Sequence, residues 1–155
     1  MEINIRKARK EDLPAMLVMI KELAEYERAP NEVDVTINKF EKYFDKKFFK
    51  ALVAYHNETL VGMAIFYIAY STWKGKIVYL DDLIVTETMR GKSVGTKLFK
   101  EVIRTSYKLK ANQLRWHVLE WNTPAINFYE KFEAGLDPEW ITGKLSKQQM
   151  EQYIS

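Results

Sequence analysis

Residues 79–96 of the chain read YLDDLIVTETMRGKSVGT, and this stretch decides how the fold is interpreted. Its first seven residues have the aromatic and aliphatic character of a β-strand, and its last six contain two glycines and lead into a helical pattern. Such a turn exposes successive backbone N–H groups at the positive end of a helix dipole, an arrangement that favours a diphosphate. Gly91 and Gly95 let the backbone approach the phosphates, and Arg90 and Lys92 add positive charge.

Two better-known phosphate motifs do not fit this turn. Residues 91–93 end like a P-loop, but the upstream glycine that a P-loop requires falls at Thr86. The dinucleotide-binding pattern Gly-x-Gly-x-x-Gly is absent from the chain as well. On these residues alone, an ordinary strand–helix connection with glycines for tight packing explains the turn as well as a phosphate site does.

The composition excludes several classes of protein. The 155 residues fit one domain over 1–155, because domains cluster near ~100–150 residues. The chain has no cysteine, which excludes disulfide scaffolds, thiolate zinc sites, iron–sulfur clusters and cysteine nucleophiles. His56 and His117 are its two histidines, too few for a multi-histidine metal centre, so no metal site is expected.

The charge pattern argues against nucleic acids and membranes as partners. The chain has 24 basic and 21 acidic residues, a net charge of +3, and its basic residues are scattered rather than gathered in a stripe. The apolar stretch 61–70 is too short to span a bilayer and is interrupted by Gly62. The N-terminus starts on strand-like alternation without an apolar signal segment. We therefore expect a soluble, cytoplasmic protein.

Hydrophobic periodicity predicts strands and helices along the rest of the chain. Strands are expected at residues 3–5, 51–55, 59–70, 76–85, 114–119 and 140–145. Helices are expected from about residue 11 to 26, after Thr36, and from the glycine turn to about residue 110. A fourth helix is expected from Thr123, which would be its N-cap, with Pro124 at its first position. A fifth is expected after Ser146, where the pattern Ser-x-x-Gln predicts a capping box. Three consecutive strands predict an antiparallel meander, and the order as a whole predicts a mixed α/β or α+β domain.

The glycine turn at 90–95 and the stretch EWNTPAINFY at 120–129 resemble the GNAT superfamily of N-acetyltransferases. The expected element order is similar along nearly the whole chain. Within the superfamily the chain looks most like the diamine acetyltransferases, of the spermidine/spermine and thialysine types, at residues 20–24, 26–27 and 79–82. The resemblance implies a mixed, mostly antiparallel central sheet splayed between two parallel strands, with helices on both faces.

The same resemblance implies acetyl-CoA as cofactor, lying between the two splayed strands. The pantetheine arm and acetyl carbonyl would meet backbone groups of Leu83, Ile84 and Val85. The pyrophosphate would be held by Arg90, Gly91, Lys92, Ser93, Val94, Gly95 and Thr96. The far side of the groove would be lined by Asn122, Thr123, Pro124 and Ala125. Physical chemistry agrees, because a backbone N–H near Leu83 can stabilise the oxyanion of acyl transfer.

Two residues are expected to handle protons. Acetyl transfer needs a proton for the leaving thiolate and removal of one from the attacking ammonium. By their positions in the resemblance, Tyr129 is the general acid and Asp81 is the base. The polyamine enzymes carry glutamate at the position of Asp81, and the shorter aspartate would need an additional water. Taken alone, a tyrosine in an apolar helix is more often a core residue. Asp81 and Asp82 are adjacent on a strand, so we expect only one to face the acceptor.

The acceptor implied by the resemblance is a small amine, which carboxylates along an extended cation would recognise. The substrate-binding candidates by position are Tyr26, Glu27, Asp81, Asp82, Glu120 and Glu139. Glu27 is explained equally well as a plain surface residue, and His117 is interpreted as an ordinary strand side chain. Exposed aromatics and long strands, together with the resemblance, favour a homodimer.

Two departures from the family pattern bear on this hypothesis. The family usually has glycine where Ser93 stands, and it commonly has glycine where Glu133 stands, in a region that often touches the acceptor. The sequence favours an acetyl-CoA-dependent enzyme that acetylates a primary amine of a polyamine or diamine by direct attack. An amino acid, an aminoglycoside or a protein lysine as acceptor stays open, as does a non-catalytic CoA-binding module of the same fold.

Overall fold

The computed structural model describes residues 1–154. The chain forms two compact units, Met1–His117 and Val118–Ser155. A single domain over the whole chain stays a prediction. None of the helices among residues 1–154 is long and apolar enough to cross a membrane.

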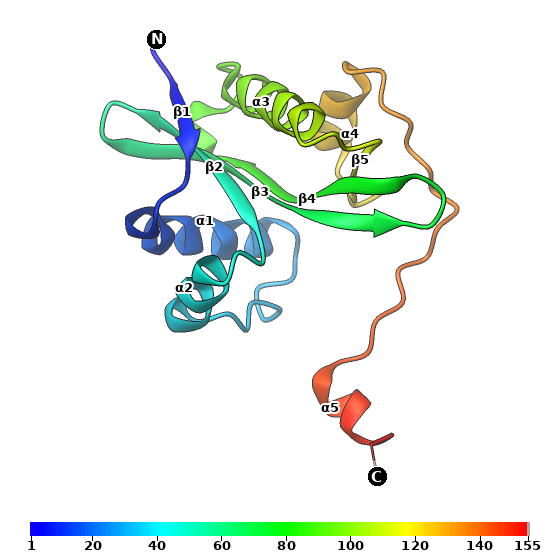
Figure 1. The fold of residues 1–155 in the computed structure, drawn as a ribbon. Coiled ribbons are helices and arrows are strands. Elements are labelled where there is room, and N and C mark those ends of the chain that lie inside the picture. The colour runs from blue at the N-terminus through cyan, green and yellow to red at the C-terminus, as the bar shows by residue number, and fades with distance from the viewer. Residues whose placement is uncertain (155) are drawn as a thin grey trace. The chain divides into compact units, whose positions relative to one another are not determined.

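A five-stranded sheet forms the centre of the first unit (Figure 1). Its strands, in spatial as well as chain order, are β1 (Asn4–Lys7), β2 (Lys50–His56), β3 (Thr59–Ser71), β4 (Gly75–Val85) and β5 (Leu114–Trp116). The first four strands pair antiparallel, and β5 pairs parallel to β4. The predicted meander and the mixed, mostly antiparallel sheet are therefore confirmed.

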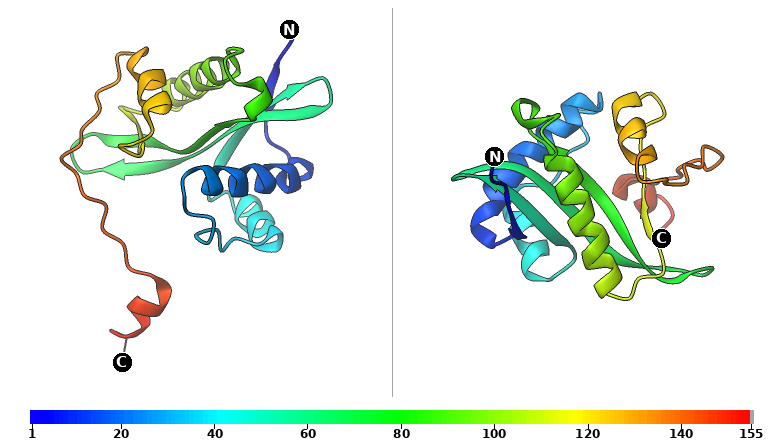
Figure 2. Two further views of the ribbon diagram at one scale, coloured as in Figure 1. Left: turned by 180° about the vertical axis from the view of Figure 1, so that it is seen from behind. Right: turned by 90° about the horizontal axis from the view of Figure 1, so that it is seen from above.

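Helices cover both faces of this sheet (Figures 1 and 2). On one face lie α1 (Leu13–Tyr26), preceded by a 3-10 turn at Lys10–Asp12, and α2 (Ile37–Asp45). On the other face lies α3 (Val94–Lys108). The N-cap of α2 is Thr36, whose hydroxyl accepts from the Lys39 N–H at 3.3 Å. The predicted helices are confirmed here, with α3 ending two residues earlier than expected.

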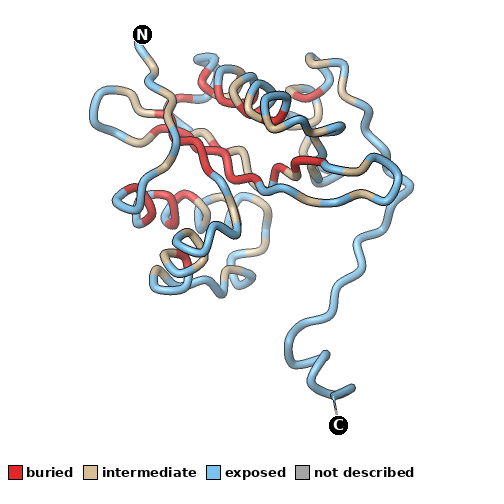
Figure 3. Tube along the Cα trace, in the orientation of Figure 1, coloured by how far each residue is buried: buried red, intermediate tan, exposed pale blue. Residues whose placement is uncertain are grey.

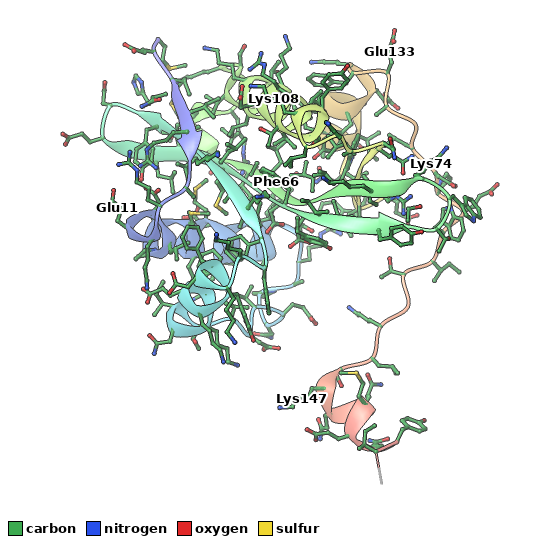
Figure 4. All side chains as sticks on the ribbon, in the orientation of Figure 1. Glu11, Phe66, Lys74, Lys108, Glu133 and Lys147 are labelled. Atoms are coloured by element: carbon green, nitrogen blue, oxygen red, sulfur yellow. The ribbon has the colours of Figure 1, made fainter. Side chains whose placement is uncertain are left out.

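The core lies where the sheet meets these helices, and Figure 3 shows the buried segments gathered in β2, β3, β4, α1 and α3. Met16, Val53 and Met63 are fully buried in the layer under α1. Phe66 on β3, labelled in Figure 4, and Leu98 on α3 are also buried. A Cβ on Gly62 would meet Leu98 at 2.8 Å, so α3 packs this closely because residue 62 has no side chain.

A buried carboxylate, Asp12, ties the start of α1 to the sheet. It accepts two hydrogen bonds from the Arg6 guanidinium, at 2.8 and 3.0 Å, one from the Arg9 N–H at 2.7 Å and one from the Tyr55 hydroxyl at 2.6 Å. Burial raises the pKa of Asp12, but these bonds together lower it to about 2. Asp12 therefore stays ionised and positions α1 against β1 and β2.

The second unit contains α4 (Thr123–Glu130) and α5 (Lys147–Glu151). The capping box at α5 is confirmed, because Ser146 and Gln149 exchange side-chain-to-backbone bonds of 2.9 and 3.1 Å. The N-cap of α4 is Asn122, which accepts from the Ala125 N–H at 3.4 Å, so the prediction of Thr123 was wrong. The side-chain amide of Asn122, one residue before Thr123, caps the free N–H groups at the start of α4 in place of the threonine hydroxyl.

Two strand predictions are corrected by the structure. The strand expected at 114–119 ends at Trp116, because β5 pairs with β4 only as far as Leu80. Residues 140–145 form no strand, although their composition favours one. A strand needs a neighbour to bond its backbone groups, and residues 118–154 contain no other strand to supply one.

Candidate active site

A β-bulge in β4 shapes the centre of the site. In the ladder between β3 and β4, Ile65 lies opposite Asp82 and Phe66 lies opposite Leu80, which leaves Asp81 as an extra residue. A bulge of this kind breaks the strict alternation of side chains and redirects them. The expectation that alternation sends Asp81 and Asp82 to opposite faces is therefore wrong for this strand. Asp82 lies opposite Ile65, a core residue that belongs to the same buried cluster as α1, so Asp82 is on the α1 face of the sheet.

Three carboxyl groups gather on this face, Asp81 and Asp82 from the bulge and Glu27 from the C-cap of α1; we call them the acidic cluster. Burial raises the pKa of Glu27, and Asp81 raises it further. Burial raises the pKa of Asp81, while His117 acts in the opposite direction. Burial, with Asp81 and Glu27 as charged neighbours, raises the pKa of Asp82 to about 7.

The end of α1 adds to this negative potential. The C-terminal end of a helix carries a partial negative charge, which basic residues in the last turn usually offset. The last turn of α1 contains no basic residue, and its C-cap is the acidic Glu27. A cation bound beside the cluster would relieve the mutual repulsion of the carboxylates and the helix end.

A row of three rings lies beside the acidic cluster. Tyr67 and Tyr79 are directly opposite on β3 and β4, with ring centroids 5.3 Å apart. His117, just after β5, has its centroid 5.5 Å from that of Tyr79, and its Nδ1 is hydrogen-bonded to the Tyr79 hydroxyl. Burial, with Asp81 as a charged neighbour, raises the pKa of Tyr79 to about 12, so its phenol stays neutral.

The sequence interpretation missed Tyr67 and Tyr79 and treated His117 as an ordinary strand side chain. Tyr79 lies within residues 79–96, but its neighbours become evident only from the register across three strands. The one available signal was the spacing of Tyr79 and Asp81, two positions apart on a predicted strand.

The edge of β4 is open beyond the bulge. Because β5 pairs with β4 only at Val78, Tyr79 and Leu80, no strand among residues 1–117 covers the β5 side of β4 from Asp81 onward. The predicted cofactor-binding residues Leu83, Ile84 and Val85 lie along this open edge.

The side chain of Arg90 links the glycine turn back to this edge. Its Nε donates to the carbonyl of Val85 at 3.2 Å, and its guanidinium lies over the Tyr26 ring, 5.5 Å from the centroid. Tyr26, a predicted substrate-binding residue, therefore contacts the turn through Arg90. The link connects the end of α1 with the segment that follows β4.

The glycine turn itself joins a 3-10 turn (Glu87–Met89) to α3. Gly91 and Ser93 both have left-handed backbone conformations, with φ of 72° and 65°. A Cβ on Gly91 would touch nothing within 4 Å, so glycine is favoured there by its backbone conformation. Ser93 is the N-cap of α3, yet its side chain makes no capping bond. The first N–H groups of α3 therefore have no intrahelical or capping partner, as an anion site requires.

The remaining predicted residues belong to the second unit, which the structure describes by itself. Tyr129 is buried on α4 and makes an edge-on contact with Phe128, at 5.2 Å between centroids. Asn122, Thr123, Pro124 and Ala125 form the cap and first turn of α4. Glu120 and Glu139 are exposed. The structure thus gathers the predicted residues of the first unit on and beside β4, while the roles of those in the second unit stay predictions.

This arrangement offers two opposite electrostatic environments along one strand. The α1 face of the bulge is negative and suits an amine cation, and the turn after β4 is positive and suits a phosphate. Within residues 1–154, no group of three histidine, aspartate or glutamate side chains forms a metal site.

Comparison with known proteins matches residues 15–134 to the Acetyltransferase (GNAT) family. The chain is 35% identical over 153 residues to a thialysine N-epsilon-acetyltransferase of Mus musculus, covering 92% of this chain and 89% of the mouse protein. It is 31% identical over 135 residues to spermidine/spermine N(1)-acetyltransferase-like protein 1 of Homo sapiens, covering 81% of this chain and 19% of the human protein.

Solved structures share the fold. An aminoglycoside acetyltransferase from an uncultured soil metagenomic sample superposes with a TM-score of 0.78 at 16% identity, over 93% of this chain and 95% of that one. An integron cassette protein of V. cholerae gives the same TM-score of 0.78 at 22% identity, over 99% and 98%. At these identities the likeness shows the fold alone.

The left-handed conformation of Ser93 yields a prediction about stability. Replacement of Ser93 by glycine should raise the free energy of unfolding by about 0.5–1 kcal/mol, because the strain of a left-handed serine exceeds the added entropy of an unfolded glycine. Urea unfolding measures the change. Lys100→Gly, at an exposed site within α3, is the control and should lower the same quantity by about 1 kcal/mol. A loss of stability in Ser93→Gly would contradict the strain.

Proposed function

The chain belongs to the GNAT family of N-acetyltransferases, and on this premise we propose that it transfers an acetyl group from acetyl-CoA to a primary amine of a small diamine or polyamine. The observation that carries the choice of acceptor is the acidic cluster of Glu27, Asp81 and Asp82 at the negative end of α1. The similarity to thialysine and spermidine/spermine-like acetyltransferases supports it.

The turn after β4 fits the diphosphate of acetyl-CoA. Acetyl-CoA supplies the acetyl group as an activated thioester. The N–H groups at the start of α3 are uncapped by Ser93, the approach to Gly91 is open, and Arg90 and Lys92 bring positive charge to the turn. The open edge of β4 from Leu83 to Val85 would present backbone groups to the pantetheine arm, and its N–H groups can stabilise the carbonyl oxygen of the acetyl group.

The acidic cluster and its rings fit an alkyl diamine. Carboxylates bind ammonium groups through charge-assisted hydrogen bonds. The faces of Tyr67 and Tyr79 offer apolar surface to the methylene chain and attract a cation. The combination favours a flexible chain that carries two positive charges over a neutral amine.

Protons are handled by two groups in this proposal. Asp81 accepts the proton that the attacking amine must lose, and Asp82, with a pKa of about 7, is a second carboxyl in range to share it. A group that titrates near the working pH is suited to this task. Tyr129 holds at its hydroxyl the proton that the departing thiolate takes up.

We also propose that the protein is a homodimer. Tyr70 and Trp73, at the end of the β3–β4 hairpin, are 79% and 82% exposed, and large exposed aromatics often mark an interface. Light scattering at several concentrations tests this proposal, and a monomer throughout would refute it.

The choice of acceptor predicts a specific substrate profile. Purified protein should release CoA from acetyl-CoA when given spermidine, putrescine or thialysine. Glu27→Gln should raise the KM for these amines about five- to tenfold, because one carboxylate of the cluster is lost. Glu25→Gln, on the same helix but exposed and outside the cluster, is the matched control and should leave the KM unchanged.

Turnover with a different amine only, found in a wider panel of amino acids and aminoglycosides, would overturn the acceptor class and leave the family assignment intact. Equal KM values for the Glu27 variant and its control would remove Glu27 from the acceptor site.

The proposed role of Tyr129 predicts a separation of turnover from binding. Tyr129→Phe should lower kcat about 100-fold or more and leave the affinity for acetyl-CoA nearly intact, because only the proton donor is removed. Steady-state kinetics and equilibrium binding measure the two quantities. Tyr107→Phe, 84% exposed on α3, is the control. An unchanged kcat in Tyr129→Phe would exclude Tyr129 from the chemistry.

A further inference from the structure

The side chain of Arg90 contacts the acceptor side of the site, although its backbone belongs to the glycine turn. Its Nε donates to the carbonyl of Val85 at 3.2 Å, and its guanidinium lies 5.5 Å from the centroid of the Tyr26 ring. A guanidinium within about 6 Å of an aromatic centroid is attracted to the face of the ring. The end of β4 and the last residue of α1 therefore both hold this side chain.

The segment that carries Arg90 is itself anchored to the sheet. The Thr86 N–H donates to the Val61 carbonyl of β3 at 2.9 Å, and the Arg90 N–H donates to the Glu87 carbonyl at 3.2 Å. Met89, the residue before Arg90, is buried. The guanidinium thus extends toward α1 from a backbone that is fixed to the core of the first unit.

The end of α1 has a defined backbone conformation. Arg28, just after the C-cap, has a left-handed φ of 61°, and the Ala29 N–H donates to the Ala24 carbonyl at 2.8 Å, as in a Schellman motif. Glu27 is the C-cap and follows Tyr26 directly. Because these residues form one compact turn, the position of the Tyr26 ring affects the position of the Glu27 carboxylate.

This link leaves the charges of the acidic cluster in place. The groups that hold the Arg90 side chain are a carbonyl and an aromatic ring, and neither is a carboxylate. A guanidinium bonded to Glu27 or Asp82 would cancel a charge that a cationic amine needs. A guanidinium on the Tyr26 ring holds the end of α1 without that loss.

We propose that Arg90 is a positioning residue of the acceptor site: packed on Tyr26 and bonded to Val85, its side chain holds the last turn of α1, and with it Glu27, against the segment that follows β4. The inference rests on the proposed function. It predicts that the Arg90 side chain affects binding of the amine more than binding of the cofactor, although Arg90 lies in the turn that is expected to receive the diphosphate.

Four variants separate the acceptor side of the site from the cofactor side. Arg90→Gln removes the charge and the guanidinium, and Arg90→Lys keeps a cation that can lie over the ring but lacks the planar fork. Lys92→Gln removes the other positive charge of the turn, and Lys100→Gln, at an exposed site on α3, is the control for loss of a positive charge. Each protein is assayed for kcat and KM with spermidine, and for the Kd of CoA by calorimetry.

The expected result is a split between the two ligands. Arg90→Gln should raise the KM for spermidine about three- to fivefold and change the Kd of CoA less than twofold, because the loosened end of α1 no longer holds Glu27 in place. Arg90→Lys should recover about half of the rise in KM. Lys92→Gln should have its larger effect on the Kd of CoA, and Lys100→Gln should match the wild type. A rise in the Kd of CoA that exceeds the rise in KM for Arg90→Gln would overturn the proposal.

A double variant tests whether Arg90 acts through the Tyr26 ring. Tyr26→Leu removes the ring and should raise the KM for spermidine at least as much as Arg90→Gln does. Once the ring is gone, Arg90 has nothing to hold at the end of α1, so the KM of the double variant should lie within about twofold of that of Tyr26→Leu. A KM that rises by the product of the two single effects would contradict the link.

A second measurement does not depend on turnover. The N–H groups of Glu27 and Ala29, which are hydrogen-bonded at the end of α1, should exchange with solvent deuterium about threefold faster or more in Arg90→Gln than in the wild type. The N–H group of Leu109, at the end of α3, is the internal control and should exchange at the same rate in both. A wild type that does not acetylate spermidine but shows this difference would refute the proposed function and keep the link. Unchanged exchange at the end of α1 would overturn the inference whatever the activity.

Discussion

The extra residue in β4 at Asp81 is the constraint on which the site depends. It follows directly after Leu80, the last residue of β4 that pairs with β5, so the ladder to β3 is interrupted where the parallel pair ends. One local irregularity thus has two consequences. It brings adjacent carboxyl groups near the end of α1, and it leaves the rest of β4 as an open edge that leads to the glycine turn.

Two carboxyl groups of this protein, the buried Asp12 and the half-buried Asp82, have opposite electrostatic environments. Asp12 has four hydrogen bonds from three donor residues, its pKa is lowered to about 2, and it stabilises the packing of α1. Asp82 has acidic neighbours, and burial with their charges raises its pKa to about 7. A fold that optimised stability alone would treat both alike. Raised pKa values of this kind are common at functional sites.

The sequence predicted elements whose signals are local. The meander, the turn before α3 and the capping box of Ser146 depend on residues a few positions apart, and all three are present. Ser93 is a departure from the family pattern, which usually has glycine at this position. The left-handed φ of Ser93 gives the physical reason why glycine is favoured there. Features that depend on register were not predictable in this way: the bulge at Asp81 and the row from Tyr67 to His117 need the alignment of three strands. Residues 140–145 have strand character but no partner strand in their own unit, which a single segment cannot reveal.

The acidic cluster is expected to bind a cationic amine and to give up a proton when it does so. Calorimetric titration of spermidine into the protein with CoA at pH 7, in two buffers of different ionisation enthalpy, measures this directly. Burial and its acidic neighbours raise the pKa of Asp82 to about 7, and a bound cation should lower that pKa and release protons from the carboxyl. The account predicts binding with a net release of protons, a release that is reduced in Asp82→Asn. Proton uptake on binding, or a release that is unchanged in Asp82→Asn, would contradict it.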